Sequence, residues 1–174
     1  MTSLHLPRPR QALAAFALVL AAVAAHAGGL DIHADADAKD VGVPIYPGAV
    51  KRNESGHDSG AFSFGIWGES FGFKLAVVSY RSTDGVEAVA AFYRDALAKY
   101  GPVLDCTGVR GKDGSHSDDK AKKDKPVTCD NDTIEAGGRL YKVGTNRAQH
   151  VFKATPWHDG VTFELVRVEE HGTD

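Results

Sequence analysis

The sequence predicts an α+β fold in which one main helix packs on a mostly antiparallel sheet. A helical repeat of apolar residues covers 83–100, and segments of alternating character lie on both sides of it. Strands that occur in runs around a single helix favour a helix layer on an antiparallel sheet. The expected order is β-β-β-α-β-(long loop)-β-β-β.

Residues 1–27 have the three parts of a secretory signal peptide. Arg8 and Arg10 precede an apolar run at 12–25, and Ala25-His26-Ala27 is a small-x-small cleavage site. The run is about 14 residues long, whereas a bilayer core requires about 20. We therefore predict cleavage after Ala27 and a periplasmic or secreted protein with no membrane segment.

Cleavage changes the charge of the chain. Because the removed segment contains two arginines and no acid, the formal charge moves from −3 to −5. A modestly acidic protein lacks the basic patch that would bind a nucleic acid, so we expect no nucleic-acid partner.

The mature chain divides into a tether and one domain. Residues 28–42 alternate Ala with Asp after Gly-Gly, and so little of this segment can be buried that we expect a flexible acidic tether. Residues 43–170 are sufficient for a single domain with a sizeable core. Pro44 and Pro47-Gly48 predict a turn or extended entry into it.

Three strands are expected before the helix, the first a short one at 49–53. The segment 61–67 has large apolar residues on one side and small ones on the other, which predicts a half-buried strand: Phe62, Phe64 and Ile66 against Ser63 and Gly65. Both sides of 71–80 are apolar after Lys74, as in the central strand of a sheet. Gly68-Glu69-Ser70 is the predicted hairpin turn between them.

The helix is predicted at 83–100. Its apolar stripe follows the helical repeat: Val86, Val89, Ala90, Tyr93 and Leu97. Asp84 is the expected N-cap, with Glu87 three residues later completing a capping box. Gly101-Pro102 is expected to end the helix.

Four strands and a long loop follow the helix. The strands are expected at 103–107, 140–145, 148–155 and 161–169, with a hairpin at His158-Asp159-Gly160. The apolar pattern of the last strand changes sides near Leu165, which indicates either a bulge there or a strand end covered on both faces. Residues 108–137 lose the apolar pattern and are expected to form a disordered charged loop.

Cys106 and Cys129 are the only cysteines. An even number of cysteines in an oxidising compartment favours a disulfide, which we predict between these two. Neither cysteine has a second Cys or His two to four residues away, so the spacing does not indicate a metal site.

Three segments resemble a group of uncharacterised exported bacterial proteins. They are Val43-Pro-Ile-Tyr-Pro-Gly-Ala49 (a YPGA entry), Ala90-Ala-Phe-Tyr-Arg94 (AAFYR) and Leu97-Ala-Lys-Tyr-Gly101 with the residues up to Cys106. The resemblance extends over most of the mature chain, from about Val43 to Glu169. It implies an architecture and export, and it brings no activity, cofactor or ligand.

Few residues form a pattern typical of catalysis. Gly68-Glu69-Ser70-Phe71-Gly72 matches the G-x-S-x-G elbow of hydrolases, but that motif requires a helix after the serine, where we expect a strand. His150 and His158 lie on one predicted hairpin and could approach each other near its end. Ser70 or this histidine pair would serve a small hydrolase or metal-dependent enzyme, which is the alternative function.

We expect a non-catalytic binding or structural module of the periplasm, without catalytic residues, cofactor or metal. Its partners are expected among cell-envelope proteins or glycans. Trp67 and Trp157 both lie beside predicted turns; on one edge they would form a stacking platform for a sugar, and otherwise they cap the core.

Overall fold

The computed structural model describes residues 28–52, 60–108, 125–129 and 132–172. The predicted signal peptide, residues 1–27, lies outside the described residues. The elements, in chain order, are β1 (Gly29–His33), α2 (Ala38–Val41), β2 (Val50–Lys51), β3 (Ala61–Trp67), β4 (Phe71–Ser82), α3 (Val86–Leu97), the 3₁₀ turn η2 (Ala98–Tyr100), β5 (Leu104–Asp105), β6 (Arg139–Gly144), β7 (Ala148–Trp157) and β8 (Gly160–Gly172).

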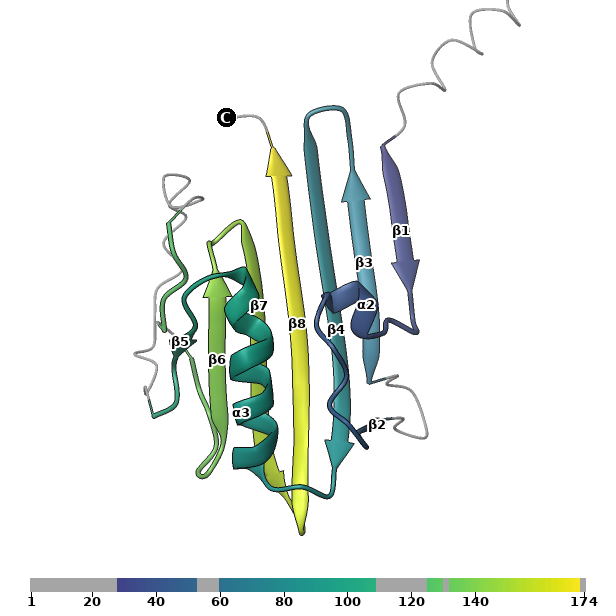
Figure 1. Cartoon of the computed structure of the whole chain (residues 1–174). Coiled ribbons are helices and arrows are strands. Elements are labelled where there is room, and N and C mark those ends of the chain that lie inside the picture. The colour runs from purple at the N-terminus through teal and green to yellow at the C-terminus, as the bar shows by residue number, and fades with distance from the viewer. Residues whose placement is uncertain (1–27, 53–59, 109–124, 130–131, 173–174) are drawn as a thin grey trace, which may run out of the picture.

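One antiparallel sheet forms the body of the protein, in the order β1-β3-β4-β8-β7-β6-β5, with β2 also paired to β4. Both α2 and α3 lie on the same side of it (Figure 1). The α+β class is confirmed, with the sheet dominant. The strand at 71–80, expected at the centre of the sheet, lies inside it between β3 and β8, whereas the middle strand of the order is β8.

The predicted element order lacks one strand and one short helix. Residues 28–42, expected to be a flexible tether, contain β1, which pairs with β3 from Gly29↔Trp67 to His33↔Ser63. They also contain α2, whose N-cap Asp37 forms a capping box with Asp40. Ala36 and Val41 are buried. Alternating Ala and Asp concealed this structure, because Ala fits under a neighbouring layer and Asp caps a helix.

The last strand contains no bulge. Its pairing with β4 runs without interruption from Phe71↔Gly172 to Ser82↔Val161. The change of pattern near Leu165 therefore reflects which side chains are covered. Leu165 is buried on the helix side, and Val166 and Val168 lie half-buried on the other side.

Tyr93 of α3 is the centre of the core. Its buried ring stacks on Phe152 at 4.8 Å between centroids and contacts Phe163 at 5.3 Å. Its hydroxyl accepts a hydrogen bond from the backbone N–H of Tyr46 at 3.1 Å, and the ring of Tyr46 meets Phe92 edge-on. The YPGA and AAFYR segments thus pack against each other. Burial of the Tyr93 hydroxyl raises its pKa far above the usual value.

The helix begins later than predicted, and its cap differs. Gly85 is the N-cap and provides no side-chain hydrogen bond, so the expected Asp84–Glu87 capping box is wrong. Asp84 instead accepts a hydrogen bond from the Tyr46 hydroxyl at 2.6 Å. Gly101 follows the terminal 3₁₀ turn with a φ of 134°, as the predicted helix stop requires.

The predicted 108–137 loop is anchored where the structure describes it. The N–H of Val127 donates to the carbonyl of Gly144 at 3.1 Å, and Pro126 forms a bridge with Thr145. Asp132 pairs with Lys142 at 2.6 Å, both side chains being largely buried. The described parts therefore pack against β6, whereas residues 109–124 and 130–131 lie outside the described residues.

Within the described chain, no helix is long and apolar enough to cross a membrane.

Candidate interaction surface

Ser70 lies in the exposed turn between β3 and β4, as the hairpin interpretation predicts. The N–H of Gly68 donates to the Phe71 carbonyl at 2.8 Å and closes this turn. Ser70 lines a pocket of about 480 Å³ that His171 and Glu169 also line. Among the described residues, Ser70 has no hydrogen bond to a histidine. A strand follows it, so the helix of a nucleophile elbow is missing.

His150 and His158 do not come together. In the β7–β8 ladder, His150 pairs with Arg167, and Trp157, the residue before His158, pairs with Gly160 at the other end. Eight residues of extended strand separate them by about 27 Å. The expectation that they approach each other near the hairpin end is wrong, and they cannot share one metal ion.

His150 occupies a buried polar cluster between the helix layer and the sheet. It is only 7 % exposed, and its ring stacks on Tyr100 at 3.8 Å between centroids. Burial, and then the charge of Arg167, lower its pKa from 6.5 to about 4, although the Val41 carbonyl and Glu169 act in the opposite direction. The imidazole is therefore neutral at physiological pH and joins the two layers as an uncharged ring.

Gly42 closes the same cluster at the end of α2. Its φ of 79° is left-handed, and its carbonyl accepts hydrogen bonds from the Tyr100 hydroxyl and from Lys99. A Cβ at this position would lie 2.8 Å from the Tyr100 hydroxyl oxygen. The cluster thus connects α2, η2 and the β7–β8 pair by close packing around His150.

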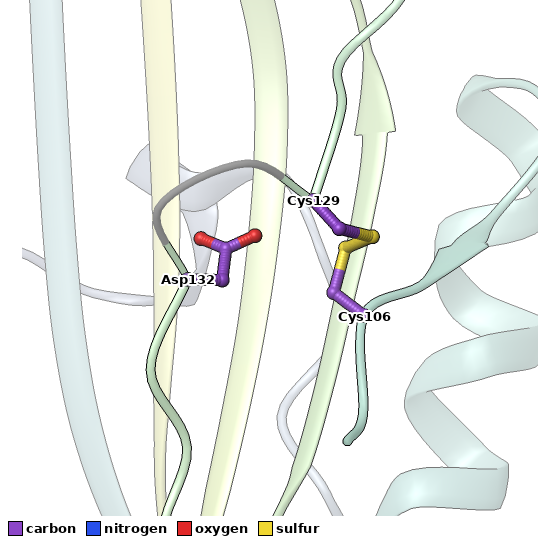
Figure 2. A group of neighbouring side chains, drawn as sticks. All are labelled: Cys106, Cys129 and Asp132. Atoms are coloured by element: carbon purple, nitrogen blue, oxygen red, sulfur yellow. A yellow bond between two sulfur atoms is a disulfide. The ribbon is translucent and has the colours of Figure 1, made fainter. Parts of the chain in front are cut away.

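The predicted disulfide between Cys106 and Cys129 is confirmed, with the Cα atoms 5.2 Å apart. Asp132 lies near it, so that these three side chains form a group with the spacing of metal ligands (Figure 2). A cysteine binds zinc as its thiolate, and both sulfurs are consumed by the disulfide. Asp132 is already paired with Lys142. The group is therefore a covalent anchor for the segment that follows β5.

The two tryptophans do not form a sugar platform. Trp67 ends β3 beside the β3–β4 hairpin, and Trp157 ends β7 at the opposite end of the sheet. The Trp67 ring lies over Gly65 and Gly29 on the helix side, where a Cβ on Gly65 would be 2.3 Å from it. The guanidinium of Arg81 lies over the ring of Trp157, with its Cζ 4.4 Å from the ring centroid. No flat aromatic surface is shared by the two rings.

The side of the sheet away from the helices is unusual because it is largely apolar. Side chains alternate along each strand, and the register of the ladders places apolar residues from five strands on this side. We call this surface the outer face: Leu30, Ile32, Phe62, Phe64, Ile66, Phe73, Leu75, Val77, Val151, Val166 and Val168.

The exposure of the outer face was not evident from the sequence. Leu30 and Ile32 are 64 % and 65 % exposed, Phe62 is 41 % exposed, and the more central residues are half-buried by their neighbours. The small side of β3, including Ala61 and Ser63, is the buried one. The alternation in 61–67 thus predicted a half-buried strand correctly, but the large residues face outwards.

Charged residues lie at the margins of the outer face. Along β8, the register places Glu164 and Glu170 at either end of Val166 and Val168. Lys153 and Lys142 follow on β7 and β6, beside the segment that carries Asp132. The centre, from β1 to β8, has no ionisable side chain among the described residues. This arrangement is suited to contact with another apolar surface and lacks groups that could activate a substrate.

The comparisons with known proteins returned no matching family, curated protein or solved structure.

Proposed function

We propose that this protein is an exported, non-catalytic binding module of the bacterial periplasm that acts through its outer face. The observation that carries the proposal is the apolar surface that extends from β1 to β7. In antiparallel sheets with one covered face, the other face is ordinarily polar. Soluble proteins rarely expose contiguous apolar patches above a few hundred Å², and larger ones mark interaction sites.

Export is supported by two independent features. The leader at 1–27 has the organisation of a signal peptide, and the Cys106–Cys129 disulfide is typical of proteins from oxidising compartments. The mature protein in the periplasmic fraction should have the intact mass of a chain that begins at Gly28. Retention of residues 1–27 in the purified mature form would contradict export.

Binding through the outer face can be tested by site-specific photo-crosslinking in the cell. A benzophenone amino acid at Phe64 replaces one aromatic side chain of the outer face by another. The matched control is the same group at Ile45, which is exposed but lies outside that face. We expect light-dependent adducts from position 64 and none from position 45. The absence of adducts from position 64 and from the same group placed at Val168, which also lies on the outer face, would overturn the proposal.

A further inference from the structure

We propose that the partner of the outer face is a second copy of this chain, packed sheet against sheet. This inference rests on the proposed function, because it names the occupant of the same surface. The centre of the outer face consists of aliphatic and phenyl side chains, including Leu75, Phe64 and Val168. It provides no group to recognise a charged or polar ligand, so its occupant must itself be apolar.

The twist of the sheet favours a copy of the same chain. Stacked sheets pack with their strands nearly aligned, at about −30°, because both have the same twist. A two-fold related copy has this twist necessarily, and its outer face is apolar over the same strands. A surface that packs on itself in this way forms a closed, isologous dimer.

The area is also that of a stable dimer. Strands lie about 4.8 Å apart and rise about 3.4 Å per residue, so five strands over six residues form an apolar centre of about 500 Å². Over the whole length of β1, β3, β4, β8 and β7, polar ends included, the face covers about 770 Å² by the same spacings. Two copies would thus bury between about 1,000 and 1,500 Å², which reaches the size of a specific interface.

The charges at the margins do not oppose this packing. The negative charges of Glu164 and Glu170 are accompanied by the positive charges of Lys153 and Arg81. The strand pairs put Lys153 directly beside Glu164. Because neither sign accumulates on the face, two copies meet without the like-charge repulsion that prevents wrong association.

Sedimentation velocity of the mature chain tests the proposal. The wild type should sediment as a dimer at concentrations of tens of micromolar. Leu75→Lys places a charge at the centre of the face, twice per dimer, and should raise the dissociation constant at least about 100-fold. Ile32→Lys does the same at a more exposed position, where the monomer fold is least affected. Ile45→Lys, at an exposed residue outside the face, is the matched control and should remain dimeric.

The outcomes separate this inference from the proposed function. A wild type that is monomeric at about 100 μM refutes the dimer, as does a dimer that both Leu75→Lys and Ile32→Lys leave intact while circular dichroism shows them folded. If the chain is monomeric but position 64 still forms adducts with another protein, the dimer is wrong and the binding module stands. Adducts of twice the mass of the chain, together with the dimer, support both.

Discussion

The buried histidine makes the stability of this protein dependent on pH, and the effect can be predicted in detail. His150 is enclosed by Tyr100 and Lys99 of η2, by Arg167 and Glu169 of β8, and by the end of α2. Its pKa in the folded protein is lowered to about 4. In the unfolded chain the imidazole has its ordinary value of about 6.5.

The sign follows from proton binding. Between pH 6.5 and 4 the unfolded chain binds a proton at His150 and the folded protein does not. Acidification therefore favours unfolding, and the contribution is fully present above pH 6.5. Each unit of difference in pKa corresponds to about 1.4 kcal/mol, so the fall from 6.5 to about 4 removes about 3 kcal/mol of folding free energy across this window. Below pH 4 the term is constant, because both states are protonated.

Urea unfolding followed by far-UV circular dichroism, at several pH values between about 7.5 and 4, measures this term. His150→Phe keeps an aromatic ring stacked on Tyr100 but cannot titrate, so its stability should fall by about 3 kcal/mol less than that of the wild type over the window. His171→Phe is the control, since His171 is exposed on the same sheet, and it should retain the wild-type dependence. Equal pH dependence in the wild type and His150→Phe would refute the reasoning.

Three further predictions concern other parts of the fold. Replacement of both Cys106 and Cys129 by Ala opens a loop of about 24 residues and should cost about 3 kcal/mol, measured as a fall of about 10 °C in melting temperature; an unchanged melting temperature would show that the disulfide does not stabilise the domain. Gly42→Ala should be about 1–3 kcal/mol more destabilising than Gly48→Ala in urea, because both positions have a left-handed φ but only Gly42 has a neighbour, the Tyr100 hydroxyl, where the Cβ would be placed; equal losses would contradict this. A serine-reactive fluorophosphonate should leave Ser70 unmodified, as mass spectrometry of the treated protein would show, whereas stoichiometric labelling at Ser70 would support the hydrolase alternative.

The sequence was sufficient where a feature depends on neighbours along the chain or on a simple count. Periodicity located α3, the long strands and the β3–β4 hairpin, because a segment that must bury one side repeats its apolar residues with the period of its structure. The pairing of Cys106 with Cys129 followed from there being only two cysteines. The small-residue side of β3 also contained a usable signal, because Ala, Ser and Gly are suited to close approach by a covering layer.

Tertiary structure decided everything that depends on which surfaces meet. Residues 28–42 are too polar to fold alone, and they become β1 and α2 because β3 offers an edge to pair with and β4 and β8 provide a surface to pack on. Asp84 was expected to cap a helix, but its carboxylate binds the hydroxyl of Tyr46, 38 residues away. The large side chains of β3 face away from the helices for the same reason: alternation records that the two sides of a strand differ, whereas the position of the helices determines which side is buried.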